Sequence, residues 1–493
     1  MNILNKPYTM NEAIRNLEPN RLWNNFADLN AVPRASKKEE QVIQFMKSFG
    51  NNLGLETFED DVRNVIIRKP ATPGMENRKG IVLQSHIDMV HQKNNDTDFD
   101  FDTQGIEMYV DGDWVRANGT TLGADNGLGV ATIMAILESD TIVHPAIDAL
   151  FTIDEETGMT GAIGLKSGIL QGEILLNLDT EEDDEIGVGC AGGVDVTASK
   201  NYLQIPSSND ANAYKITIKG LQGGHSGMEI QLGLGNANKL MNRILSEVHD
   251  NCSLSTLLGG SLRNAIPRES NAVVVVEANK TINFLDGFEK MKNKIKNEFH
   301  HIESDITIRA EKVTVPETVL SVEDQDQFFK AVYAAHNGVF RMSPAIEDLV
   351  ETSNNIAKIT VNNGSITIEC LTRSSVDSSK DNMVNTLTAV FELAGFSVSL
   401  SGDYPGWAPN MDSAILKVLA ALYEKMNGEK ANVAACHAGL ECGILGTNYP
   451  GMDMISFGPT IKGAHSPDER ACISSTQKFW SFLKEILKEI PLK

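Results

Sequence analysis

The chain has 493 residues, of which 41% are hydrophobic and 22% are charged. This length and composition predict a globular protein with two to four domains. The formal net charge of -23 disfavours nucleic acid or an anionic membrane as a partner, because phosphate groups are repelled by so acidic a surface.

The cysteines and the N-terminus bear on the compartment. The six cysteines include no CxxC pair, so we expect reduced thiols and no disulfide scaffold. The stretch Met1–Pro7 lacks the apolar core of a signal peptide. No apolar run is long enough to span a membrane. We therefore expect a cytoplasmic protein.

In the first part of the chain, predicted helices alternate with predicted strands. Helices are expected over residues 19–29, 39–49 and 128–137. Short apolar runs typical of buried strands occur at 65–67, 80–83, 146–153 and 173–178. This β-α-β rhythm predicts an α/β domain with a mostly parallel central sheet flanked by helices on both faces.

The middle of the chain has a different pattern. Period-two alternation and a turn signal at 362–364 predict strands at 214–218, 272–278, 305–313, 357–361, 365–370 and 396–400. Helices are predicted over 236–248, 288–299, 324–335 and 380–393. The pattern indicates two α+β units in tandem, inserted into the α/β domain.

The end of the chain returns to the first pattern. A helix is predicted over 413–426 and a strand over 453–457. Ser466-Pro467-Asp468-Glu469 resembles a capping box, so the last helix is expected to begin there. We predict one discontinuous domain, 1–187 and 403–493, interrupted by an inserted domain at 188–402.

Five short segments place potential metal ligands near predicted strand or helix ends. They contain His86 and Asp88; Asp125; Glu155 and Glu156; Asp179; and His465. Each segment alone has an ordinary explanation as a polar strand end, a helix cap or a solvated turn. Together they supply mixed nitrogen and oxygen ligands, most of them where open α/β sheets place their sites. That set suits a pair of divalent cations, with zinc first and cobalt or manganese as alternatives.

The order of these motifs resembles the M20 family of metallopeptidases, most closely its aminoacyl-histidine dipeptidase branch. The resemblance covers nearly the whole chain, including the size and place of the insertion. The matching stretches are Gln84–Val90, Gly123–Gly127, Asp154–Gly158, Gly223–Gly227, Arg263–Glu269 and His437–Gly443. No ligand position departs from the family pattern.

The resemblance implies a role for each residue of the α/β domain. His86 and Asp179 would complete one metal site, and Glu156 and His465 the other. Asp125 would bridge the two metals, and its bond to Asn126 would be cis. Asp88 would orient His86, and Glu155 would be the general base.

For the inserted domain, the resemblance implies a lid that contributes to catalysis. His225 would stabilise the oxyanion, in its own subunit or in a neighbouring one. Asn264 would contact the substrate backbone. Arg373 is a candidate for binding the substrate carboxylate, because Arg grips a carboxylate bidentately. Gly439 and Glu441 are candidates for the substrate end of the pocket.

The implied activity is hydrolysis of dipeptides with a free amino terminus, Xaa-His and broader. The resemblance also suggests a homodimer. An N-acyl amino acid deacylase or a tripeptidase on the same two-metal site is the alternative. A non-catalytic metal-binding protein would have lost a ligand or the base, and neither is missing.

Overall fold

A computed structural model describes residues 11–493, so the expectation about Met1–Pro7 concerns residues outside the described part. The chain divides into two compact units. The first comprises Met1–Gly189, Pro409–Ala435 and Leu440–Lys493, and the second comprises Cys190–Ala408 and Cys436–Gly439. Within residues 11–493, no helix has the length and apolar content needed to cross a bilayer. Among residues 11–493, which contain all six cysteines, no disulfide bond is formed.

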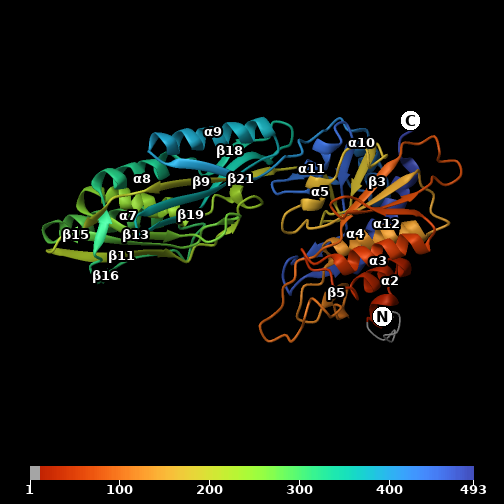
Figure 1. The fold of residues 1–493 in the computed structure, drawn as a ribbon, viewed down its shortest axis with the longest axis horizontal. Helices are drawn as coiled ribbons and strands as arrows, with labels where there is room; N and C mark the ends of the chain where they lie inside the picture. Colours follow the sequence, from red (N-terminus) through yellow and green to blue (C-terminus); the bar gives the residue numbers. More distant parts are fainter. Residues whose placement is uncertain (1–10) are drawn as a thin grey trace. The chain divides into compact units, whose positions relative to one another are not determined.

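The first unit is built on a mixed eight-stranded sheet (Figure 1). In spatial order its strands are β1 (Glu56–Glu59), β2 (Val65–Lys69), β6 (Ile147–Thr152), β3 (Ile81–His86), β7 (Ile174–Asn177), β23 (Asp453–Ser456), β8 (Glu185–Cys190) and β22 (Asn432–Cys436). The central strands β6, β3, β7 and β23 are mutually parallel. Every residue of β3, β6 and β7 is buried, which explains why these strands are rich in apolar residues and lack an apolar–polar alternation.

Helices and a small sheet complete this unit. The helices are α1 (Glu12–Arg15), α2 (Asn20–Leu29), α3 (Glu40–Asn52), α4 (Ala124–Glu138), α5 (Thr160–Gly164), α10 (Ala414–Asn427), α11 (Glu441–Asn448) and α12 (Ile473–Glu489). Helix α4 is apolar on all sides, and accordingly nearly all of it is buried. The small sheet has the order β24 (Ile461–Lys462), β25 (Arg470–Cys472), β5 (Trp114–Ala117) and β4 (Met108–Asp111).

The second unit contains a nine-stranded antiparallel sheet with helices packed against it (Figure 1). Its strand order is β16 (Thr307–Val313), β11 (Ala211–Lys219), β15 (Ser270–Glu277), β13 (Ser253–Gly259), β19 (Val350–Asn362), β20 (Ser365–Ser374), β9 (Gly192–Asn201) and β21 (Ser397–Tyr404), and β18 (Gly338–Met342) also pairs with β19. Two-stranded ladders join β12 (Gly224–His225) to β14 (Ala265–Ile266) and β10 (Gln204–Pro206) to β17 (Thr318–Leu320). The helices are α6 (Ala237–Glu247), α7 (Thr281–Phe299), α8 (Val322–Ala334) and α9 (Asp377–Leu393), with 3₁₀ turns at 230–232, 249–251 and 278–280.

Two expectations need correction. The predicted tandem α+β units share one continuous sheet, because β13 of the first pairs with β19 of the second. The last helix begins at Ile473 and not at the Ser466–Glu469 capping box. Those residues form a turn that leads into β25, and β25 pairs with β5. A non-local strand pairing thus outweighs a strong local helix signal.

Candidate metal centre

The parallel strands of the first unit bring the predicted ligands to one edge of the sheet. His86 is the last residue of β3, Asp179 follows the end of β7, and Glu156 follows the end of β6. Because β6, β3 and β7 are adjacent and parallel, their carboxyl ends lie together. Asp125 in the first turn of α4 and His465 in the loop before β25 complete the group.

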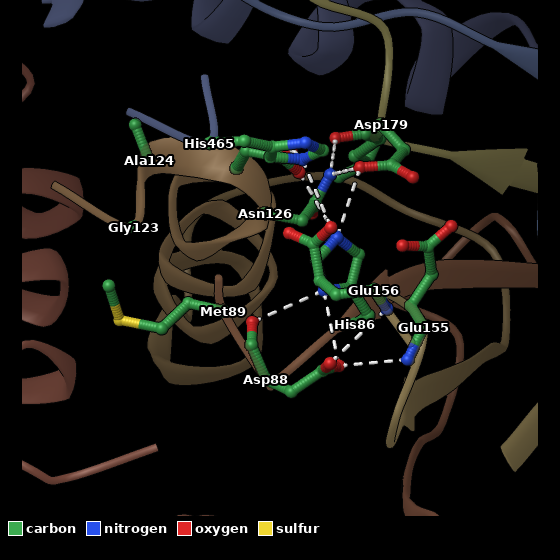
Figure 2. Close-up of polar contacts among 12 residues, drawn as sticks. His86, Asp88, Met89, Gly123, Ala124, Asn126, Glu155, Glu156, Asp179 and His465 are labelled. Atoms are coloured by element: carbon green, nitrogen blue, oxygen red, sulfur yellow. Dashed lines mark hydrogen bonds and ion pairs between the residues drawn. The ribbon is translucent and has the colours of Figure 1, made fainter. Parts of the chain in front are cut away.

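The side chains of the predicted ligands converge, and the Asp125 carboxylate contacts both His86 and His465. Figure 2 shows His86, Glu156, Asp179 and His465 gathered in this cluster. On one side, His86 Nε2 is 3.1 Å from Asp125 Oδ1 and 3.5 Å from Asp179 Oδ1. On the other, His465 Nε2 is 3.2 Å from Asp125 Oδ2 and 3.0 Å from Glu156 Oε2. The Asp125 carboxylate therefore offers one oxygen to each of two nitrogen–oxygen donor sets.

The spacing of these donors fits zinc. Zn²⁺ with ligands at about 2.0–2.2 Å in a tetrahedron holds its donor atoms about 3.3–3.6 Å apart. The distances of 3.0–3.5 Å from the two histidine nitrogens to carboxylate oxygens lie within a few tenths of that range. Ligand atoms of His86, Asp125 and Glu156 also all lie within 4.8 Å of one another.

The negative charge of the clustered carboxylates also favours bound cations. Asp88, Asp125, Glu156 and Asp179 have side-chain exposures of 0%, 13%, 4% and 8%. Buried carboxylates are costly unless they are paired or coordinate a metal. Oxygen Oε1 of Glu156 is buried and has no hydrogen-bond partner. We conclude that the residues present fit a metal centre.

Asp88 holds several parts of the cluster in place. Its Oδ1 is 3.3 Å from His86 Nδ1, the ring nitrogen that faces away from Asp125. The same carboxylate accepts hydrogen bonds from the backbone N–H groups of Glu155 (3.1 Å) and Glu156 (3.3 Å) and from the Ser36 hydroxyl (2.8 Å). A carboxylate on the second ring nitrogen fixes the orientation of a metal-binding histidine.

Glu155 differs from its neighbour in what its side chain contacts. The carboxylate of Glu156 contacts His465, whereas no hydrogen bond or ion pair of the Glu155 carboxylate is found among residues 11–493, and no contact reaches it in Figure 2. Burial raises the pKa of the Glu155 carboxyl well above its usual range; the charge of His86 opposes this, and Asp179 adds to it. An acid with a raised pKa beside a metal centre is suited to general base and acid work.

The ligands themselves have perturbed pKa values. Burial would lower the pKa of His86, but Asp179 and Asp125 raise it well above its usual value. Hydrogen bonds that His465 donates to the Asp125 and Glu156 carboxylates raise the pKa of His465 to about 11. Burial opposes the shift at Asp125, whose pKa is lowered by His465 and His86. The acids thus stabilise positive charge at the two positions where histidines lie.

Asn126, which the sequence analysis gave no role of its own, braces a ligand. The Asp125–Asn126 peptide bond is cis, as the resemblance implied. The Asn126 amide donates to Asp179 Oδ1 and to the carbonyl of Leu178 (2.8 Å for the latter). It therefore ties the end of β7 to the start of α4.

Arg34 and Glu469 also contact the ligand loops, and the sequence analysis missed both. Arg34 is 1% exposed and donates to the carbonyls of Ile87, Asp88 and Gly123. Glu469 accepts hydrogen bonds from the backbone of the Asp125 loop. The only sequence signal for Glu469 was its place after His465, and Arg34 lies in no recognisable motif.

Glu441 lies in a buried polar row beneath the ligands. Its Oε2 accepts hydrogen bonds from Gln84 and Thr152, each at 2.6 Å. Gln84 Oε1 in turn accepts from Asn177 (2.5 Å), and Asn177 Oδ1 accepts from Ser456 (2.5 Å). Burial raises the pKa of Glu441 to about 8. The row crosses β6, β3, β7 and β23 and locks the register of the strands whose ends provide ligands.

In the second unit, His225 and Asn264 are neighbours across the β12–β14 ladder. His225 pairs with Ala265, and Ser226 donates its N–H to the Asn264 carbonyl at 2.8 Å. His225 Nδ1 accepts the N–H groups of Gly227 (3.2 Å) and Met228 (3.0 Å). With Nδ1 accepting, the proton of the neutral ring is on Nε2, which makes that atom a donor.

Arg373 of β20 is also in the second unit, together with Gly439. Arg373 is 5% exposed and donates to the Tyr404 hydroxyl at 3.0 Å. No ion pair joins it to a carboxylate among residues 11–493, and its Nε is buried without a partner. Burial, together with nearby Arg373 and His225, lowers the pKa of His437 to about 3. The second-unit candidates thus gather around the segment that contains His437 and Gly439.

Comparison with known proteins agrees with this geometry. Residues 82–489 match the model of peptidase family M20/M25/M40. Over 97% of its length the chain is 43% identical to the cytosol non-specific dipeptidase of Escherichia coli K12, covering 99% of that protein. The crystal structure of aminoacylhistidine dipeptidase from Vibrio alginolyticus superposes with a TM-score of 0.90 at 45% identity, over 97% of this chain and 98% of that one.

A more distant structure shares the fold alone. The aminopeptidase PepT from Bacillus cereus superposes with a TM-score of 0.56 at 16% identity, covering 96% of this chain and 99% of that one. The family match and the identity to the dipeptidases extend over nearly all of the chain. The chain therefore belongs to peptidase family M20.

Proposed function

We propose that this metallopeptidase is a dipeptidase that hydrolyses short peptides with a free amino terminus, with two divalent cations held by His86, Asp125, Glu156, Asp179 and His465. The dipeptidase activity is supported by the extent and level of identity to the two dipeptidases described above. The two-cation assignment is supported mainly by one observation: both oxygens of Asp125 face a histidine nitrogen, one on each side.

The chemistry divides between the cations and the protein. When bound, the cations would lower the pKa of water towards neutrality and polarise the scissile carbonyl. Glu155 takes the proton from the attacking water and delivers it to the leaving amine. Its carboxylate is suited to both steps because its pKa is raised and because it forms no ion pair of its own with the described residues. Asp88 orients the His86 ring.

Residues of the second unit complete the assignment. His225 stabilises the oxyanion, and Asn264 contacts the substrate backbone. The donor state of His225 Nε2 supports its role. Arg373 binds the substrate carboxylate, supported by its buried guanidinium without an acidic partner. Gly439 of the second unit and Glu441 of the first unit are assigned to the substrate end of the pocket.

The remaining assignments follow the relatives. Zinc is the first choice of metal, with cobalt and manganese as alternatives, because the donors are histidine and carboxylate. The Escherichia coli protein is named for the cytosol, and we extend that location to this chain. We also retain the homodimer as a proposal, which sedimentation of the purified protein would test.

A substrate panel tests the proposed function. Metal-free protein and protein supplied with zinc, manganese or cobalt are assayed on Ala-His, Gly-Gly-Gly and N-acetyl amino acids. The proposal predicts metal-dependent hydrolysis of Ala-His at the highest rate. Faster cleavage of the tripeptide or of the N-acetyl compounds would replace it with a tripeptidase or a deacylase.

A further inference from the structure

Glu469 is a buried carboxylate whose two oxygens are occupied by backbone donors. Its side chain is 2% exposed. The donors are the N–H groups of Leu122 (2.7 Å) and Gly123 (3.0 Å) to Oε2, and of Ala124 (2.7 Å) and Asp125 (3.3 Å) to Oε1. Helix α4 begins here, and its N-cap Gly123 provides no side-chain cap. Glu469 therefore caps α4 from a distant part of the chain.

The backbone of Glu469 belongs to the loop that contains His465. Its N–H donates to the carbonyl of Ser466 at 3.0 Å and closes the turn that follows His465. The next residues form β25, which pairs with β5 and fixes the end of this turn. One residue thus joins two ligand loops, the His465 loop through its backbone and the Asp125 loop through its carboxylate.

The Asp125 loop is held on its other side by Arg34. The Arg34 guanidinium donates to the carbonyls of Gly123 (2.5 Å) and Asp88 (3.0 Å). A Cβ atom added at Gly123 would lie 2.4 Å from Arg34 Nη2, so the loop backbone and the guanidinium approach closely at this point. On its other side, the four hydrogen bonds to Glu469 limit movement of the Asp125 loop away from His465.

We propose that Glu469 is a positioning residue that sets the distance between Asp125 and His465 and thereby the affinity for the cation between them. This inference rests on the proposed two-cation function. The chemistry requires a carboxylate, because four N–H donors need two acceptor oxygens. A glutamine of the same size would turn an amide N–H₂ group towards two of the donors and would loosen the loop.

A purely structural role would predict a different result, and Asp453 provides the matched control. Asp453 also caps a helix of the first unit through its carboxylate. It accepts hydrogen bonds from Ser413 Oγ (2.6 Å), Ala414 N–H (3.1 Å) and Ile415 N–H (3.2 Å) at the start of α10. None of these residues is a proposed ligand. Asp453→Asn thus removes a comparable cap away from the metal centre.

The experiment compares Glu469→Gln, Glu469→Asp, Asp453→Asn and the unchanged protein. Zinc affinity is measured by competition with a chromophoric chelator, stoichiometry by elemental analysis, and melting temperature on the metal-free proteins. Loss of an outer partner of a metal ligand typically weakens metal binding about 10–100-fold. In Glu469→Gln we expect a loss of this size for the cation between Asp125 and His465. In Glu469→Asp we expect a smaller loss of affinity, and in Asp453→Asn a change below about twofold.

Two results would overturn the inference. One is zinc affinity in Glu469→Gln within about twofold of the unchanged protein. The other is an equal loss of affinity in Asp453→Asn. If Glu469→Gln does not fold, Glu469→Asp is judged by the same criterion. Failure of the unchanged protein to bind two cations would instead refute the proposed function and is recorded separately.

Discussion

The two halves of the proposed metal centre differ in how firmly the protein holds their ligands. The His86 side chain is 1% exposed, whereas that of His465 is 56% exposed. His86 ends a fully buried strand, and His465 lies in a loop with a positive φ of 62°. A ligand on a packed strand is held more rigidly than one on an exposed loop. We therefore expect the cation beside His86 to bind more tightly than the cation beside His465.

The partners of the two rings strengthen this contrast. Asp88 lies 3.3 Å from Nδ1 of His86. In the part of the chain that the structure describes, no carboxylate forms an ion pair with Nδ1 of His465; both of its ion pairs are to Nε2. The first half is thus organised before a cation arrives, while the second depends on Glu469 and on the cation itself.

The largest expected effect comes from removing each histidine. We expect His86→Ala to lose both cations and all detectable turnover, because the first half organises Asp125 for the second. His465→Ala should retain one cation per chain and little turnover. Elemental analysis and Ala-His hydrolysis measure both, with exposed His91→Ala as the control. If His86→Ala and His465→Ala kept the same number of cations, the proposed difference between the two halves of the metal centre would be wrong.

The next largest effect is expected at Asp88, which orients the His86 ring. Asp88→Asn keeps the size of the side chain but weakens its bond to the ring and to the Glu155 amide. We expect zinc affinity or turnover to fall about 10–100-fold. Ser36→Ala, which removes one further contact of Asp88, should have a much smaller effect. If Asp88→Asn and Ser36→Ala lost equal zinc affinity or turnover, metal binding would depend on burial of the loop and not on the orientation of the His86 ring.

A smaller effect is expected on the rates at which the two cations are released. A chelator added to the zinc-loaded protein should remove the cation beside His465 first, since that side chain is more exposed. Stopped-flow absorbance of a coloured chelator should show two phases of equal amplitude. A single phase that releases both cations together would remove the proposed difference between the halves.

The smallest effect concerns stability of the metal-free protein. The pKa of Glu441 rises from 4.5 to about 8 on burial, so the folded state favours its protonated form. This contribution is complete below about pH 4.5 and is lost as the pH rises through about 8. At about 1.36 kcal/mol per pKa unit, the upper limit is about 5 kcal/mol.

Glu441→Gln cannot ionise, and its unfolding free energy should depend less on pH between 5 and 8. Urea unfolding of the metal-free variant and of the unchanged protein at pH 5, 6, 7 and 8 gives the difference. Parallel curves over this range would show that Glu441 is ionised in the folded state throughout.

The sequence was sufficient to predict strands β2, β3, β6, β7 and β23 of the eight-stranded sheet, whereas β1, β8 and β22 were not predicted. Short apolar runs at 81–83 and 174–176, a few residues before His86 and Asp179, mark buried parallel strands, and β3 and β7 lie there. Chain order then places the acids at the strand ends. The whole set of proposed metal ligands lies in the first unit, in the segments that the motifs indicated.

The braces of the ligands could not be predicted, because they depend on distant contacts. Glu469 caps a helix through Leu122, 347 residues away in sequence, and the local pattern around it favoured a helix start instead. Arg34 donates hydrogen bonds to backbone carbonyls. Because every residue has a backbone carbonyl, the residue types of its partners give no signal in the sequence. Likewise, nothing local specifies that β13 pairs with β19 across about a hundred residues of chain.

The most direct test of the account measures metal content and turnover together in the unchanged protein and in Glu155→Gln. The account predicts two divalent cations per chain in both proteins and a fall in Ala-His turnover of about 10²–10⁴-fold in the variant, because only the base has been removed. Near-normal turnover of the variant with full metal content would contradict it, as would an unchanged protein that is active without any cation.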